Sequence, residues 1–159
     1  MIIFLIIILV IVIPFSIFSA TFVPPQEKVF LSLGEYEIVE YCEAGVFQDF
    51  TIYYEITYEN LNIENNEYLK QMTETDIEEF SLYLDNFDGW VELHIESGDE
   101  SKEQFVQNYD FDRNIISTND YCYIYDSADY DDFYAKFESY DLYFYDTETE
   151  TLYYFHNNI

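Results

Sequence analysis

Residues 50–58 read FTIYYEITY, and side chains of two kinds alternate along this stretch. The apolar and aromatic side chains that would share one face are Phe50, Ile52, Tyr54, Ile56 and Tyr58. Thr and Glu residues alternate with Tyr53 on the opposite face. A period of two is typical of a β-strand, because successive side chains of a strand point to opposite sides. The sequence therefore predicts a strand over 50–58.

Similar apolar rows lie on both sides of this segment. They predict further strands at 29–33, 36–41, 91–95, 121–125 and 152–155. An additional row at Phe133, Ala135 and Phe137 has a different parity from Leu142 and Phe144, which predicts a bulge or turn near Ser139.

Two short helices are expected between the strands. Thr75-Asp76-Ile77-Glu78 has the spacing of a capping box and precedes Phe80. Residues 101–109 place Phe105, Val106 and Tyr109 at helical spacing. Parallel strands would need long helices between them, and the sequence predicts only short ones. The chain is therefore predicted to be an all-β protein with antiparallel strands. We expect residues 26–159 to form an acidic antiparallel β-sandwich, of jelly-roll or related type, with one or two short helices.

The first 25 residues differ in composition from the rest. Every residue from Ile2 to Ile13 is Ile, Leu, Val or Phe, and no charged residue precedes Glu27. We interpret 1–25 as a signal peptide or an N-terminal membrane anchor, a hydrophobic helix of which residues 1–23 would span the bilayer if uncleaved. Both alternatives predict an extracytoplasmic protein, either secreted or anchored by this segment.

Cys42 and Cys122 are the two cysteines of the chain. An even pair in an exported chain predicts a disulfide between them. A redox or metal-binding pair is the alternative, but those sites usually have closely spaced cysteines.

The order of features resembles the Golgi-dynamics (GOLD) type of β-sandwich. The resemblance rests on Tyr36 and Ile38, Gly45, the strand 50–58, and the late stretch 119–127, NDYCYIYDS. It implies a sandwich that is used for protein interaction. The cysteines lie in places comparable to those of the cargo-receptor members, although Cys122 comes two positions early. Secreted bacterial pre-peptidase-type sandwiches have a similar layout and remain an alternative.

Charge limits the choice of partner. The 159 residues include 33 acidic and five basic side chains, a formal net charge of −28. Nucleic acid is excluded as a partner, because binding to phosphates depends on basic side chains. A basic protein partner is expected instead.

Clustered carboxylates suggest a calcium site. Asp126, Asp129, Asp131 and Asp132 fall in one predicted turn, and calcium prefers six to eight oxygen ligands. A solvated acidic turn is the alternative, since the cluster does not match the EF-hand pattern. No other cofactor is expected.

Trp90, together with Tyr83, Phe87, Asp85 and Asp88, could stack on a sugar, whereas core packing is the alternative for a large aromatic residue beside a strand. His94 lies between Glu92 and Glu96, where a surface histidine is favoured over a general base.

No sequence motif of a known catalytic centre is present, so a non-enzyme is expected. The leading hypothesis is an exported interaction module for a protein partner. A carbohydrate- or calcium-binding surface domain is the alternative, and a glycosidase is a third, because two carboxylates suffice for that reaction.

Overall fold

The computed structural model describes residues 25–46, 49–63, 66–96, 105, 107–127 and 137–158. Within these ranges lie the α-helices α2 and α3, further helical residues at 105, 107 and 108, a short 3-10 helix and six strands. Their order is α2 (Pro25–Leu33), β1 (Tyr36–Val46), β2 (Asp49–Tyr58), β3 (Lys70–Gln71), α3 (Glu74–Glu96), η1 (Arg113–Ile115), β4 (Tyr121–Asp126), β5 (Ser139–Asp146) and β6 (Thr151–Asn158). The predicted leader and residues 133 and 135 of the predicted Phe133 row are outside the described residues.

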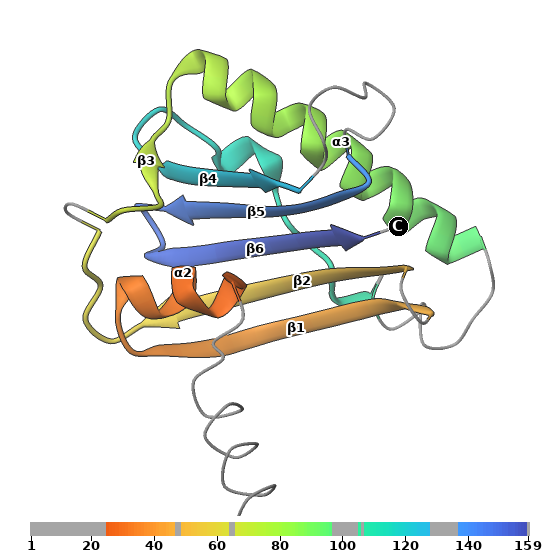
Figure 1. Cartoon of the computed structure of the whole chain (residues 1–159), viewed down its shortest axis with the longest axis horizontal. Coiled ribbons are helices and arrows are strands. Elements are labelled where there is room, and N and C mark those ends of the chain that lie inside the picture. Colours follow the sequence, from red (N-terminus) through yellow and green to blue (C-terminus); the bar gives the residue numbers. More distant parts are fainter. Residues whose placement is uncertain are drawn as a thin grey trace, which may run out of the picture.

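The six strands form one sheet in the order β1-β2-β6-β5-β4-β3, and every neighbouring pair is antiparallel. The predicted antiparallel β-rich fold is confirmed, as are strands at 36–41, 50–58, 121–125 and 152–155. Figure 1 shows the sheet with β1 at one edge. Ser139, where the change of parity predicts an irregularity, begins β5 two residues after Phe137, which has φ 76°.

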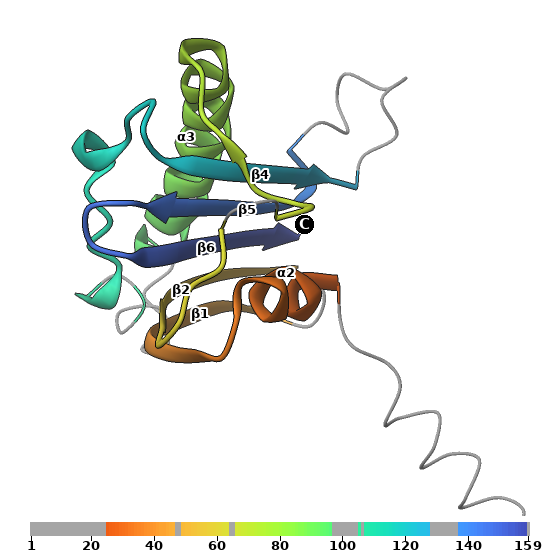
Figure 2. The ribbon, with the colours of Figure 1, turned by 90° about the vertical axis from the view of Figure 1, so that its left-hand side faces the viewer.

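The two α-helices cover opposite faces of the sheet, as Figures 1 and 2 show. Among the described strands there is no second sheet, so the expected sandwich is not confirmed. Helices occupy the layers that a facing sheet would fill. The chain instead packs α2 and α3 against the two sides of a single sheet.

Two predicted strands are wrong because each is part of a helix. Residues 91–95 belong to α3, and 29–33 belong to α2. In α3 the buried residues Phe80, Leu84, Phe87 and Val91 follow at intervals of three and four, which is the period of a helix face. The short apolar row at 91–95 fits a strand only when it is considered without residues 74–90, which precede it in the same helix. The helix also passes through Gly89.

Helix α3 begins with a capping box two residues before the predicted one. The Thr73 hydroxyl accepts a hydrogen bond from the backbone N–H of Asp76 at 3.2 Å, and Asp76 Oδ2 accepts one from the Thr73 N–H at 2.9 Å. Lys70 Nζ lies 2.6 Å from Asp76 Oδ1. A carboxylate in the first turn also interacts favourably with the helix dipole. These contacts define the start of a helix of 23 residues, rather than the short one expected.

Each face of the sheet has its own core. The core under α3 includes Phe80, Leu84 and Phe87 of the helix packed on Tyr53, Leu142, Phe144 and Phe155. The core under α2 includes Val29, Phe30 and Leu33 packed on Ile56, Tyr143, Leu152 and Tyr154. Adjacent residues of one strand therefore enter different cores, as Tyr143 and Phe144 do. Both are at most 1% exposed.

Gly34 joins α2 to β1 in a conformation that other residues rarely adopt, with φ +135°. A Cβ atom at this position would lie 2.8 Å from the backbone oxygen of Asn60. We predict that Gly34→Ala lowers the free energy of unfolding by about 1–3 kcal/mol, measured by chemical denaturation. Gly89→Ala is the matched control, because a Cβ there meets no atom within 4 Å and α3 gains about 0.5–1 kcal/mol. Equal effects of the two substitutions would contradict this account.

The start of α3 should make stability depend on pH. Hydrogen bonds from Lys70, and then from Thr73, lower the pKa of Asp76 from 3.8 to about 2. A carboxyl group with a lowered pKa stabilises the fold above its unfolded pKa, and this contribution disappears as pH falls through the folded pKa. Asp76→Asn should therefore be less stable than the native chain at about pH 7, with the difference shrinking between about pH 4 and pH 2.

Denaturation curves at several pH values measure this difference. Glu78→Gln, an exposed position on the same helix, is the control and should change stability little at each pH. A difference for Asp76→Asn that persists unchanged at about pH 2 would contradict the role assigned to its charge.

Candidate functional site: the β1 edge

Strand β1 forms the long open edge of the sheet. It has 11 residues and, in the part of the chain that the structure describes, pairs with β2 alone. The strand at the other end of the sheet, β3, has two residues. An edge strand presents backbone N–H and C=O groups that can pair with another chain. The longest such row in the described sheet therefore lies along β1.

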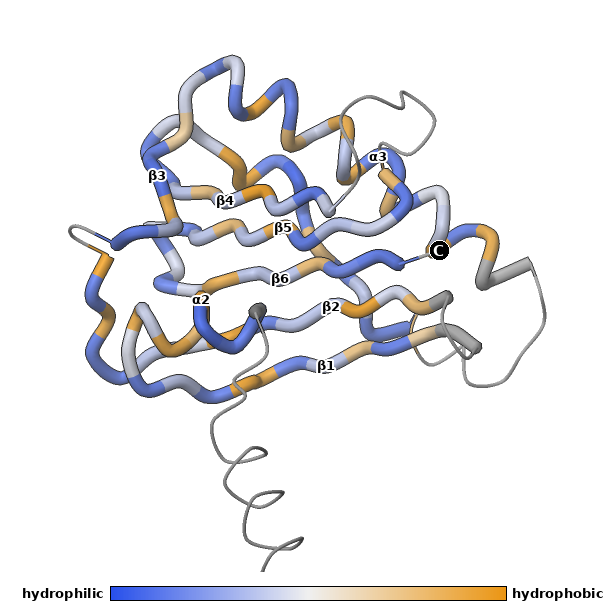
Figure 3. The backbone as a smooth tube through the Cα atoms, in the orientation of Figure 1, coloured by the Kyte–Doolittle hydropathy of each residue, from blue (hydrophilic) through white to orange (hydrophobic). Residues whose placement is uncertain are grey.

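Apolar side chains are exposed at this edge. Ile38 is 41% exposed, Val39 51% and Tyr41 50%. Pairing with β2 shifts register between Ile38 and Glu40, so Val39 is the extra residue of a bulge. Figure 3 shows hydrophobic and hydrophilic residues mixed along β1, the lowest strand in that view. The edge thus offers three sizeable apolar contacts within four residues.

Carboxylates flank these residues on both faces of the sheet. On the α3 side, Glu40 lines a hollow of about 260 Å³ with Glu55 and Asp110. On the α2 side, Glu43 accepts a hydrogen bond from the Tyr41 hydroxyl. A ligand strand along β1 would meet negative charge on either side.

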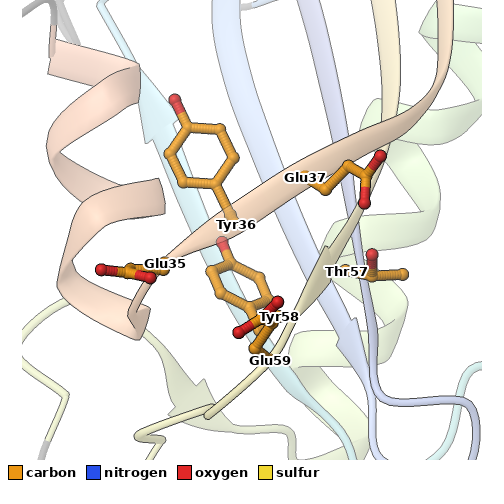
Figure 4. Close-up of a pocket in the computed structure, with 6 residues that line it drawn as sticks. All are labelled: Glu35, Tyr36, Glu37, Thr57, Tyr58 and Glu59. Carbon is orange, nitrogen blue, oxygen red and sulfur yellow. The ribbon is translucent and has the colours of Figure 1, made fainter.

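The beginning of β1 has a second acidic hollow, of about 340 Å³. Figure 4 shows the rings of Tyr36 and Tyr58 on one side of the β1–β2 pair, with Glu37 and Thr57 on the other. The two ring centroids are 6.2 Å apart. The carboxylates that line this hollow are Glu35, Glu37 and Glu59.

The negative potential affects titratable groups of the edge. Burial, and then the nearby Glu40, Asp110 and Glu55 carboxylates, raise the pKa of Cys42 to about 12. The hydrogen bond to Glu43 is the main cause that raises the pKa of Tyr41 above its usual value. Both shifts have the sign expected where negative charge is already concentrated.

Two of the basic side chains in the described residues are engaged elsewhere. Arg113 forms ion pairs of 2.5 Å with Asp85 and with Asp88 on α3. Lys70 pairs with Asp76 at the start of the same helix. Neither can neutralise the carboxylates of β1, so the edge retains the capacity to attract a cationic partner.

The expected disulfide is not formed, and this corrects the prediction from the sequence. Cys42 and Cys122 are buried free thiols on β1 and β4. Three strands separate β1 from β4 in the sheet. Four strand spacings amount to roughly 19 Å, whereas the Cα atoms of a disulfide lie within about 7 Å.

The predicted calcium ligands are only partly described. Asp126 lies at the end of β4 and accepts a hydrogen bond of 2.7 Å from the Tyr83 hydroxyl. Asp129, Asp131 and Asp132 are outside the described residues. Among the residues that are described, no group of three acidic, cysteine or histidine side chains could hold a metal ion. Calcium binding at this cluster stays a prediction.

Trp90 is half-buried on α3 rather than at the edge of a strand. Its predicted companions Tyr83 and Phe87 are core residues, 2% and 0% exposed. Asp85 and Asp88 are paired with Arg113. The structure therefore does not assemble these five residues into one exposed surface, and a ligand at Trp90 stays a prediction. The side chain of His94 is outside the described part.

One polar cluster escaped the sequence analysis. His156 Nδ1 lies 2.7 Å from Asp141 Oδ1, and the Tyr154 hydroxyl donates to the same oxygen at 2.6 Å. The Phe50 and His156 ring centroids are 5.0 Å apart. Burial is the main cause that raises the pKa of Tyr154, so this phenol stays neutral. Asp141 and His156 are 15 positions apart in the sequence, and no local motif links them. They meet because the β5–β6 register places them opposite each other.

No protein-family model matches the chain, and no curated protein or solved structure matches it either. Neither described helix has the length and apolar character needed to cross a membrane.

The two thiols provide a direct test of the structure. Burial raises the pKa of Cys122 to about 11 and that of Cys42 to about 12. Little reactive thiolate therefore forms near neutral pH. We predict slow reaction with Ellman's reagent in the native state, full reaction of both thiols in denaturant, and no effect of a reductant on the melting temperature. A melting temperature that falls with reductant would show a stabilising disulfide instead.

Proposed function

We propose that this chain is an exported, non-catalytic interaction module that binds an extended, basic segment of a protein partner along β1. The observation that supports this most is the open 11-residue strand, which combines exposed apolar side chains with flanking carboxylates. The leader at 1–25 supports export, with the module either secreted or held at the membrane.

Backbone pairing would provide the basic affinity. An extended peptide that adds a strand to an open sheet edge satisfies the N–H and C=O groups of that edge. Alternate side chains of the added strand would then lie over the two faces of the sheet. Ile38 and Tyr41 offer apolar contacts on the α2 side, where Glu43 also lies.

Charge selects the kind of segment. A partner strand with Lys or Arg would place cations near Glu37, Glu40 and Glu43. A second copy of this chain paired through β1 would instead bring like charges together across the strands, which is destabilising. The occupant favoured by the edge is therefore a basic segment of another protein.

A short peptide that alternates lysine and valine is the probe for this proposal. We expect it to bind the full chain at low salt, to lose affinity at high salt, and to slow hydrogen exchange of amides in 36–46. The double variant Glu37→Lys/Glu43→Lys should weaken binding by roughly tenfold or more.

The matched control is Glu78→Lys/Glu92→Lys on α3, which changes the net charge by the same amount at exposed positions. Its binding should weaken only about two- to threefold, because these carboxylates belong to α3 and not to β1. Equal losses in both double variants would show a response to net charge alone. Dimerisation of the chain through β1 without peptide would also overturn the proposal.

A further inference from the structure

The α2 face of the sheet has a second feature, a cavity of about 220 Å³ that we call the tyrosine cavity. Four tyrosines and one carboxylate line most of it: Tyr68, Tyr123, Tyr125, Tyr143 and Asp141. Lys28 and Val29 of α2 complete the lining. The cavity shares no lining residue with either hollow beside β1, and it has no part in the binding proposed for that strand.

The sheet register places the lining residues in two cross-strand pairs. Tyr123 lies opposite Tyr143, and Tyr125 lies opposite Asp141, between β4 and β5. Residues two apart on a strand share a face, so all four side chains lie on the α2 side. The ring centroids of Tyr123 and Tyr143 are 5.6 Å apart. This pair and Tyr125 give one side of the cavity a largely aromatic surface.

Tyr68 adds a ring at a different angle. It precedes β3, and its centroid lies 5.7 Å from that of Tyr123 with the ring planes inclined by 54°. The face of an aromatic ring is the negative side of its quadrupole, and four rings line this one cavity. That arrangement is suited to a positively charged group.

Asp141 adds a carboxylate to the lining. Its two hydrogen bonds, from Tyr154 and with His156, both involve Oδ1, while the side chain also lines the cavity. The same carboxylate contributes, after burial, to the raised pKa of Tyr143. A raised tyrosine pKa has the sign expected of negative potential, which also favours a cation.

We infer that the tyrosine cavity binds a small organic cation whose positive group is a methylated ammonium. A metal ion fits less well, because calcium needs six to eight oxygen ligands and this lining contains one carboxylate. A bare ammonium ion is strongly hydrated and would lose that water among the rings. A methylated ammonium is recognised by aromatic faces, and its charge complements Asp141.

The volume limits the occupant to a small group. Sites for drug-sized ligands measure about 300–1,000 Å³, more than this cavity offers. A trimethylammonium group is small, whether it belongs to a free molecule or ends a modified lysine side chain. Both sources share one chemistry and can be separated by experiment.

Tetramethylammonium chloride is the probe, titrated into the full chain against sodium chloride at equal ionic strength. We expect saturable NMR shifts around β4 and β5 with tetramethylammonium alone. Tyr125→Leu should weaken binding roughly two- to fivefold. Leu82→Ala on α3 is the control, since Leu82 is 54% exposed and lines neither proposed site, and it should bind as the native chain does.

Lys28→Met removes a positive charge from the lining, so it should tighten binding of the cation. Weaker binding of tetramethylammonium by Lys28→Met would contradict the expected effect of charge and would overturn the inference. Identical responses to sodium and tetramethylammonium, or equal losses in the Leu82 and Tyr125 variants, would overturn it as well. None of these outcomes bears on the basic segment at β1, which is tested by Glu37 and Glu43.

A peptide with one trimethyl-lysine separates the two sources. Tighter binding of this peptide than of choline, with displacement by tetramethylammonium, would support a modified side chain. Equal affinity for choline and the peptide would support a free cation. Failure of all three compounds to bind saturably would overturn the inference.

Discussion

The fold depends on the burial of both faces of its central strands. Tyr143 and Phe144 are neighbours in β5, and Tyr154 and Phe155 are neighbours in β6, yet all four are at most 2% exposed. Because neighbouring side chains point to opposite faces, neither face of these strands can be left in water. Each large aromatic side chain contributes about 1.5–3 kcal/mol when buried. A covering layer on each side is therefore required, and α2 and α3 supply it.

Asp120, Asp141 and Asp146 are buried, but many other acidic residues lie at the periphery of the covered centre. The described ion pairs of Arg113 and Lys70 neutralise carboxylates on α3 and at its start. The carboxylates of Glu40, Glu55 and Asp110 instead gather beside the open edge of the sheet. The proposed binding surface thus follows from the same constraint as the core. Aromatic side chains fill the interior, and charge collects where the sheet ends.

The tyrosines show how one residue type serves both regions. Tyr53 and Tyr143 are almost fully buried, whereas Tyr41 and Tyr125 are about half exposed at different strands of the same sheet. A phenol has an apolar ring and a polar hydroxyl, so it can pack in a core or line a wet cavity. This dual character explains how a strongly aromatic chain forms both a double core and the tyrosine cavity.

Long alternation predicted its strand correctly, whereas the five short apolar rows predicted three strands correctly and two wrongly. The nine residues at 50–58 determine a strand by themselves, because their period of two matches no helix. The rows at 29–33 and 91–95 are too short to distinguish a strand from one side of a helix. For α3 the helical period emerges only when Phe80, Leu84 and Phe87 are read together with Val91. The capping residues Thr73 and Asp76 then mark where it begins.

The sequence by itself determined an acidic, aromatic-rich, antiparallel β protein with an apolar N-terminal stretch and a formal net charge of −28. Only the tertiary structure decided that helices cover the sheet, that Cys42 and Cys122 stay apart, and that Asp141 meets His156 and the tyrosines. The physical reason is that composition and period act locally, along the chain. Strand order and register join residues distant in sequence, and no local pattern records which strands become neighbours.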